Sequence, residues 1–113
     1  MWLFTTDGFY SAVEDKHDPS FILVRTRTAQ DAANLQDRLA AIRCHVEVEA
    51  TPHADYGWRL LVPRLMWAIY LQNAVEAIDY TNFKDKVHEV QGQKRSDLYL
   101  DVWSTLWDLQ HGR

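Results

Sequence analysis

The sequence predicts an α+β fold in which helices cover one face of a mostly antiparallel sheet. Segments rich in aromatic and β-branched residues come in two pairs, and a segment with helical periodicity follows each pair. Further helical segments close the chain. We therefore expect a ferredoxin-like ββαββα layer of sheet and helices with an additional C-terminal helix. At 113 residues, the chain is expected to form a single domain over residues 1–113.

The N-terminal part predicts two strands. Residues 2–6 and 9–14 are rich in aromatic and β-branched types, which are favoured in strands. The Asp7-Gly8 pair between them fits either a tight hairpin turn or a glycine bulge within one long strand. We favour the bulge, because a hairpin at this position leaves very short arms. After a polar turn closed by a proline, residues 21–27 predict the second strand.

The middle of the chain predicts one helix and two more strands. Residues 28–31, Thr-Ala-Gln-Asp, resemble a capping box with Asp in place of Glu or Gln. A stripe of apolar residues follows at helical spacing, namely Ala32, Leu35 and Leu39. Residues 45–50 alternate between polar and apolar types, which predicts a half-buried strand with one solvated face. A loop at 51–57 leads to the fourth strand at 58–62.

A helix is expected to begin at Pro63, because proline suits the first turn of a helix. The helix carries apolar residues at helical spacing. We expect a single core-facing stripe of Ala68, Leu71, Val75 and Ile78, which Trp67 and Ala74 widen.

Residues 78–84, Ile-Asp-Tyr-Thr-Asn-Phe-Lys, form the joint between this helix and the next one. We expect Asp79 or Thr81 to cap the short helix that follows, and Phe83 to anchor it. Gly92 is expected to end that helix.

Composition indicates the compartment of the protein and excludes some classes of partner. The net charge of −4 argues against wide contact with nucleic acid, which needs a basic surface. A lone cysteine, Cys44, forms no internal disulfide, which favours a reducing compartment. The N-terminus lacks the features of a secretion signal, and no stretch has the apolar length of a membrane span. We therefore expect a cytoplasmic protein.

The first candidate site is a cluster of basic and aromatic residues. Arg25 and Arg27 share one face of the second strand, and Arg59 lies on a later strand. Flanking loops and joints add four more residues, namely Tyr56, Tyr80, Asn82 and Lys84. If the strands are neighbours, guanidinium groups and phenols converge on a small anionic ligand. The alternative is structural, with the arginines paired to Glu47, Glu49 and Asp55 on a solvated face.

A second candidate site combines acidic and imidazole groups. His53 and Asp55 are two residues apart in a loop, and His45 and Glu47 are two apart on a strand. Such pairs can ligate a metal ion, yet no spacing in the chain matches a recognised metal signature. We therefore predict no metal and no cofactor. Cys44 is expected to be a half-buried structural cysteine.

A third candidate is a contact surface on the last helix, which Ser96-Asp97 can cap. Its leucines and valine recur at helical spacing, and three aromatics adjoin them: Tyr99, Trp103 and Trp107. One helix rarely buries two such stripes within a small domain. The apolar residues beyond one stripe predict either a wide core face or a surface for a protein partner, including a second copy in a symmetric dimer.

Motifs spread over almost the whole chain resemble a family of small uncharacterised bacterial and phage proteins. The motifs are Met1-Trp2-x-Phe4-Thr5, Gly8-Phe9-x-Ser11, Val24-Arg25-x-Arg27, Thr51-Pro52-x-Ala54-Asp55-Tyr56 with Arg59, Val62-Pro63, Ile78-Asp79-Tyr80-x-Asn82-Phe83-Lys84, Val102-Trp103-Ser104 and Leu109-Gln110. No reaction is established for that family, so the resemblance implies recurrent residues and no activity. The recurrent polar residues imply either a shared site or a buried polar network that fixes the joint between sheet and helix.

Taken together, the sequence predicts a small non-enzymatic module that binds a protein partner or a small anionic, nucleotide-like ligand. The residues expected to bind are Arg25, Arg27, Tyr56, Arg59, Tyr80, Asn82 and Lys84, and those expected to hold structural junctions are Asp55, Asp79 and Phe83. One alternative is a metal-dependent phosphodiester hydrolase or transferase that uses Asp55, His53 or Asp79. Another is an inhibitor or adaptor of phage or host that acts through its aromatic surface.

Overall fold

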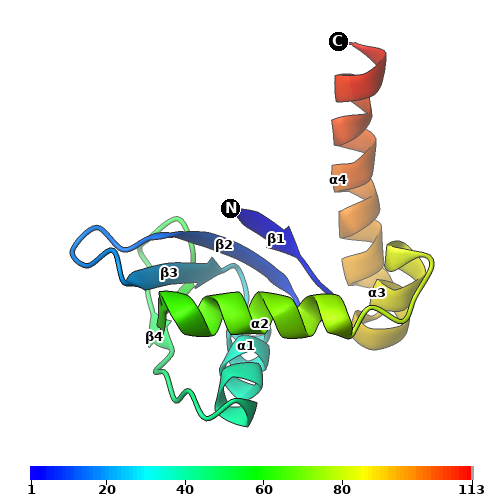
Figure 1. Ribbon diagram of the computed structural model, residues 1–113. Coiled ribbons are helices and arrows are strands. Elements are labelled where there is room, and N and C mark those ends of the chain that lie inside the picture. Colours follow the sequence, from blue (N-terminus) through cyan, green and yellow to red (C-terminus); the bar gives the residue numbers. More distant parts are fainter. Residues whose placement is uncertain (113) are drawn as a thin grey trace. The chain divides into compact units, whose positions relative to one another are not determined.

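The computed structural model describes residues 1–112, and the chain forms two compact units. The first unit spans Met1–Ile78 and the second begins at Asp79 (Figure 1). The first unit is a sheet with two helices, and the second is a pair of helices. The prediction of one domain over residues 1–113 stays a prediction.

The first unit contains an antiparallel sheet. Its strands are β1 (Trp2–Phe4), β2 (Phe9–Glu14), β3 (Phe21–Thr26), β4 (Glu49–Ala50) and β5 (Trp58–Pro63). The strand order is β1-β2-β3-β5-β4, and every neighbouring pair is antiparallel. The predicted α+β class is therefore confirmed. The ferredoxin-like ββαββα layout is not confirmed, because a fifth strand lies at the β2 edge and gives this order.

The favoured glycine bulge is wrong, because β1 and β2 form a hairpin. The Thr5 backbone N–H donates to the Gly8 carbonyl oxygen at 2.9 Å, which closes the turn. The Thr5 hydroxyl oxygen accepts the backbone N–H groups of Asp7 and Gly8. These bonds stabilise the turn locally, so the short arm of β1 is tolerated.

Helices α1 (Ala29–Ala41) and α2 (Arg64–Glu76) pack on one face of the sheet (Figure 1). The core lies between them and the sheet. It is formed by Tyr10, Ala12, Ile22, Val24, Ala32, Leu35, Leu39, Leu60, Val62, Trp67 and Tyr70. The stripe predicted for α1, from Ala32 to Leu39, is confirmed because its three residues are fully buried.

The N-terminus of α1 ties the helix to the β1–β2 hairpin. The Thr28 side chain caps the helix by accepting the Asp31 backbone N–H at 3.1 Å, as the sequence predicts. The Asp31 carboxylate, only 2% exposed, accepts the Phe9 backbone N–H at 3.0 Å. A Cβ atom at Gly8 would lie 2.5 Å from the Asp31 carboxyl carbon. Glycine at this position therefore allows the carboxylate to reach the hairpin.

The strand predicted at residues 45–50 is shorter in the structure. Residues 45–48 are not a strand, and pairing begins only at Glu49. The Val46 carbonyl oxygen instead accepts the Gln36 side-chain amide at 2.9 Å, and Val46 and Val48 pack against the core. The alternation of polar and apolar residues at 45–48 therefore reflects alternating burial of the side chains, although the backbone there pairs with no strand.

The core-facing stripe predicted for α2 is confirmed only in part, because Trp67 is buried and Leu71 packs against the core. Val75 is 66% exposed and Ile78 also lies on the surface, whereas Trp67 is 4% exposed. The Trp67 ring stacks on Tyr70 at 5.2 Å, and both rings meet Tyr10 edge-on. Because large aromatics bury more area than aliphatic residues, the helix turns its aromatic face toward the sheet.

The second unit consists of α3 (Phe83–Gln91) and α4 (Gln93–His111). Asn82 caps α3 by accepting the Asp85 backbone N–H at 3.0 Å, so the expected cap at Asp79 or Thr81 is wrong. Phe83 stacks on Tyr99 of α4 at 5.9 Å, which agrees with its predicted anchoring role. Gly92, with φ of 91°, separates the helices as predicted.

Within residues 1–112, no helix combines the length and apolar character needed to cross a membrane.

Candidate functional site

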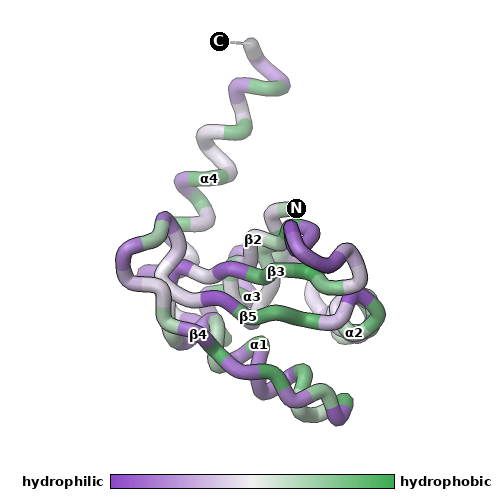
Figure 2. Tube along the Cα trace, turned by 90° about the vertical axis from the view of Figure 1, so that its left-hand side faces the viewer, coloured by the Kyte–Doolittle hydropathy of each residue, from purple (hydrophilic) through white to green (hydrophobic). Residues whose placement is uncertain are grey.

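The sheet face opposite the two helices carries the predicted arginines. Cross-strand pairs place Trp2, Ser11, Arg25, Arg59 and Glu49 in one row across the sheet, because directly paired residues share a face. The hydrophilic ends of β3 and β5 lie side by side and continue into apolar stretches (Figure 2). The row therefore sits at the end of the sheet nearest the loop at residues 51–57.

Arg25 is held by contacts on both sides. Its Nη2 atom donates to the Ser11 hydroxyl oxygen at 2.8 Å. Its guanidinium carbon lies 4.8 Å from the centre of the Tyr56 ring. Ser11 is 1% exposed, so the hydrogen bond is sheltered from water. These contacts fix the guanidinium without a carboxylate partner among the described residues.

Tyr56 organises a second arginine. The Arg27 guanidinium carbon lies 4.1 Å from the Tyr56 ring centre, and Arg27 Nη1 donates to the Asp55 carbonyl oxygen at 2.5 Å. Tyr56 is 5% exposed. Its ring therefore positions two guanidinium groups by cation–π contact and has little surface left for a ligand.

Arg59 forms an ion pair with Asp55. Its Nη2 atom lies 3.2 Å from Asp55 Oδ1, and the same oxygen accepts the Tyr56 backbone N–H. The loop is closed by the Thr51 backbone N–H, which donates to the Gly57 carbonyl oxygen at 2.7 Å. Asp55 thus contacts both Arg59 and the backbone of its own loop. The ion pair is largely exposed on the Asp55 side, which limits its strength.

The row leaves positive charge incompletely compensated. Arg25 and Arg59 are direct cross-strand neighbours, and like charges in such positions repel each other. Their Nε atoms are buried and have no hydrogen-bond partner among residues 1–112. Buried donors without acceptors cost free energy. The two Nε donors are therefore unsatisfied within residues 1–112.

The remaining predicted ligand residues lie in the second unit. Tyr80 packs on Phe83 with ring centres 6.0 Å apart, and the Asn82 side chain is engaged in capping α3. Lys84 follows in the first turn of α3. Asp79, predicted as a junction residue, lies 3.3 Å from the Lys86 ammonium group. The structure thus brings four of the seven residues into one cluster: Arg25, Arg27, Tyr56 and Arg59.

Sequence reasoning missed Ser11, Trp2 and Phe9. Trp2 is 71% exposed and meets Phe9 edge-on at 6.1 Å, which gives the row an aromatic end. The signal was present in the β2–β3 hairpin, whose register pairs Ser11 with Arg25. The predicted glycine bulge gave no position for Trp2, because only the β1–β2 hairpin places Trp2 opposite Ser11.

A polar cluster also lies within the core. The Tyr10 hydroxyl donates to the Asp31 carbonyl oxygen at 3.1 Å, and the Tyr70 hydroxyl donates to Asp7 Oδ2 at 3.2 Å. Burial raises the pKa of both phenols well above the ordinary value, and the Asp7 carboxylate raises them further. The two phenols thus stay neutral, which suits a structural role.

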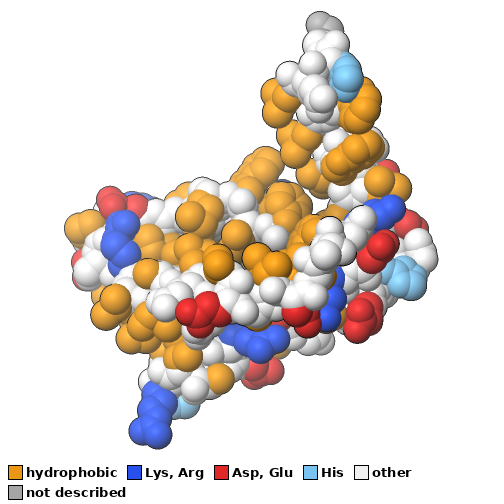
Figure 3. Space-filling view, turned by 45° about the vertical axis from the view of Figure 1, so that its right-hand side comes forward, with side chains coloured by type: hydrophobic (Ala, Val, Ile, Leu, Met, Phe, Trp, Pro, Cys, Tyr) orange, Lys and Arg blue, Asp and Glu red, His pale blue; other side chains and the backbone are white. Residues whose placement is uncertain are grey.

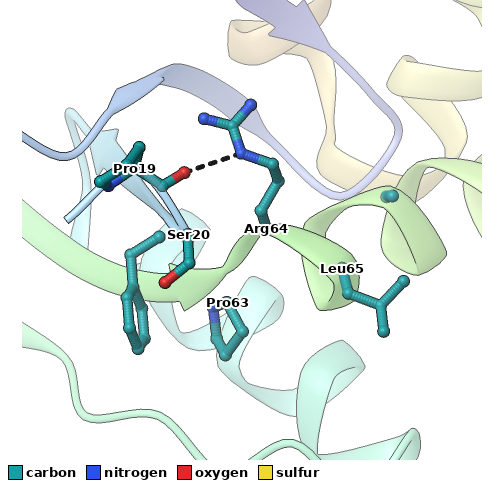
Figure 4. A pocket seen from close by; sticks show the side chains of 7 residues that line it. Pro19, Ser20, Pro63, Arg64 and Leu65 are labelled. Carbon is teal, nitrogen blue, oxygen red and sulfur yellow. Dashed lines mark hydrogen bonds between the residues drawn. The ribbon is translucent and has the colours of Figure 1, made fainter.

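A shallow hollow of about 690 Å³ lies where the β2–β3 turn meets the start of α2 (Figure 4). Pro19, Phe21, Pro63, Leu65 and others line it. Its one charged group, Arg64, donates from Nε to the Pro19 carbonyl oxygen at 2.9 Å and pairs with Glu14 at 2.6 Å. None of the predicted site residues lies in this hollow, and its walls offer few polar groups to a ligand.

In the part of the chain that the structure describes, no group of three or more His, Cys, Asp or Glu side chains is arranged to hold a metal ion. Asp55 and Asp79, two residues named for the metal-dependent alternative, belong to different units.

The sequence matches no protein-family model, and no similar protein was found among curated proteins or solved structures. The resemblance to small bacterial and phage proteins stays a prediction.

Proposed function

We propose that the first unit is a binding module for a small phosphate-bearing ligand of the nucleotide type. The observation that supports it is the Arg25–Arg59 cross-strand pair, whose buried Nε donors have no partner among the described residues. A phosphate that accepts hydrogen bonds from these guanidinium groups would offset the repulsion between them. Arg27, positioned by Tyr56, adds a third cation nearby.

An aromatic group in the ligand is supported by Trp2. Trp2 lies in the same row as Arg25, two strands away across Ser11, so about 10 Å of sheet separates the backbones. A nucleoside monophosphate is long enough to place its phosphate near the arginines and its base on the exposed indole. Stacking of a base on an aromatic side chain contributes about 1–3 kcal/mol.

The test is thermal unfolding of the full chain with inorganic phosphate, adenosine and AMP, each up to 10 mM. At a concentration tenfold above Kd, AMP should stabilise the fold by about 1.4 kcal/mol, which raises Tm by several degrees. Phosphate should act more weakly and adenosine least. No change with any of the three would overturn the proposal.

Matched variants localise the effect. Arg25→Gln and Arg59→Gln should abolish the response to AMP and phosphate. Arg64→Gln removes an arginine from the distant Glu14 pair and should leave both responses intact. Trp2→Ala should reduce the AMP response to that of phosphate while phosphate still binds. If Arg64→Gln lowers the response as much as Arg25→Gln, binding is non-specific and the assigned site is wrong.

A further inference from the structure

Helix α4 exposes a large apolar surface. Among the described residues of α4, Ser96 is the only buried one. Trp103 is 59% exposed and Leu109 is 85% exposed, and Leu98, Leu106 and Trp107 are also open to solvent (Figure 3). Monomeric soluble proteins rarely leave such a contiguous surface without a partner.

The apolar residues occupy one side of the helix. At 100° per residue, Val102, Trp103, Leu106, Trp107 and Leu109 fall on one broad arc. The opposite arc carries Asp97, Asp101, Ser104, Thr105 and Asp108. Only Gln110 interrupts the apolar arc in this stretch. The apolar arc is therefore a defined surface and not a scatter of exposed side chains.

Helix α3 covers only the first part of this arc. Phe83, the first residue of α3, stacks on Tyr99, and α3 then runs toward the α4 N-terminus (Figure 1). Beyond Tyr99, the arc continues for 12 residues to His111, about 18 Å of helix. Trp103, Trp107 and His111 stack in sequence along it, with ring centres 5.3 and 4.0 Å apart. The three rings form a continuous ridge along the helix.

The charges on α4 exclude some classes of binding partner for this surface. Residues 96–111 contain three aspartates and no lysine or arginine. Nucleic acid and anionic membranes both require basic residues on the binding helix, so neither fits. The three aspartates lie on the polar arc, so the surface complementary to the apolar arc is an uncharged helix face, and the apolar arc of a second copy supplies one.

We propose that residues 100–111 of α4 bind the same residues of a second copy in antiparallel orientation, centred near Leu106. In this arrangement the partner helix continues the line of α3 along α4, with the same direction, so the apolar arc is covered from end to end. Two antiparallel helices also oppose their macrodipoles favourably. The exposed tryptophans and leucines offer on the order of 500 Å² per copy, so the pair buries about 1,000 Å², the lower limit for a specific interface. This interface is independent of the anion site.

Sedimentation velocity of the full chain between about 1 µM and 1 mM tests the proposal. We expect a monomer–dimer equilibrium within this range. Trp103→Glu should abolish the dimer, whereas Ser104→Glu adds the same charge one residue away on the polar arc and should leave it intact. Leu106→Glu is a second variant for the apolar arc, and circular dichroism confirms that each variant keeps its helices. A monomer at every concentration, or a dimer that survives both apolar-arc variants, would overturn the proposal.

Cysteine crosslinking tests the orientation in a Cys44→Ser background. In the antiparallel pair, Leu106→Cys lies at the centre and should form a disulfide with its own copy. Leu109→Cys lies about 9 Å along the axis from its counterpart and should crosslink poorly. Efficient crosslinking at both positions would indicate a parallel pair and contradict the proposal. Flotation of the protein with neutral phosphatidylcholine vesicles should show no binding, and recovery in the floated fraction would make a lipid surface the occupant instead.

Discussion

The two units of the chain differ in how far their apolar side chains are buried. The first unit buries leucines, valines and aromatics between a sheet and two helices, and it exposes a polar row on the other sheet face. The second unit buries little of α4 and exposes its tryptophans and leucines. The two units therefore expose different kinds of surface: a cationic row on the sheet of the first unit, and the apolar arc of α4 in the second. We infer a small anion for the first and a second copy for the second.

The largest expected effect comes from the same substitution made once in each unit. Leu39→Ala empties a fully buried site, which should lower the free energy of unfolding by about 2–5 kcal/mol. Leu109→Ala changes a side chain that is mostly in water and should cost under about 0.5 kcal/mol in dilute, monomeric protein. Urea unfolding at low micromolar concentration measures both. Equal costs would remove the contrast between the units.

Gly8→Ala probes the close approach of hairpin and helix in the first unit. The new Cβ would lie 2.5 Å from the Asp31 carboxyl carbon, so the carboxylate must leave the Phe9 N–H. We expect a loss of about 1–3 kcal/mol in the free energy of unfolding. Gly57→Ala is the matched control, since its nearest neighbour is the Arg27 carbonyl oxygen at 3.8 Å, and it should stay within about 0.5 kcal/mol. A neutral Gly8→Ala would mean that the two elements are not rigidly joined.

Stability should fall in alkaline solution because of Tyr10 and Tyr70. Both have a raised pKa in the folded protein, so below about pH 10 folded and unfolded states are equally protonated and stability is full. Above that pH the unfolded tyrosines lose protons and the folded ones keep them. The free energy of unfolding should then fall by about 1.4 kcal/mol per pH unit for each tyrosine.

Denaturant unfolding between pH 8 and 12 measures this slope. Tyr70→Phe should make it shallower, and Tyr80→Phe, outside the core cluster, should not. An unchanged slope in Tyr70→Phe would show that this phenol is not the source.

The smallest expected effects separate the helix caps of the two units. Thr28→Ala and Asn82→Ala each remove one side-chain acceptor at a helix N-terminus and should each cost about 1 kcal/mol. Hydrogen exchange should locate the first loss in α1 and the strands that it covers. The second loss should appear in α3 and α4. Loss of protection in the strands after Asn82→Ala would show that the second unit supports the first.

Much of the first unit could be predicted from sequence, because local signals agree with the packing there. The Thr28 cap and the stripe at Ala32, Leu35 and Leu39 both hold in the structure. The arginines of β3 and β5 could be placed on one face, because strand side chains alternate. Their direct pairing depended on strand order, which periodicity alone does not give.

The failures have identifiable causes. The stripe predicted for α2 placed Trp67 at its margin and extended to Val75 and Ile78, whereas Trp67 and Tyr70 are buried in the core and the end of the helix is exposed. The alternation at residues 45–48 was read as a strand, although only Glu49 and Ala50 find a partner in β5. The cap of α3 was expected at Asp79 or Thr81, although the Asn82 side chain takes that position. In each case, a contact distant in sequence or a competing local bond decided the outcome.

The proposed anion site depends most on the two buried Nε–H groups of Arg25 and Arg59, which NMR observes directly. Arginine Nε–Hε signals can be assigned with Arg25→Lys and Arg59→Lys and followed during titration of the full chain with AMP. The predicted result is a saturable shift of these two signals, with the Arg64 signal unchanged. Signals that stay in place at millimolar AMP, or that shift equally in all arginines, would contradict the assignment of the sheet face as an anion site.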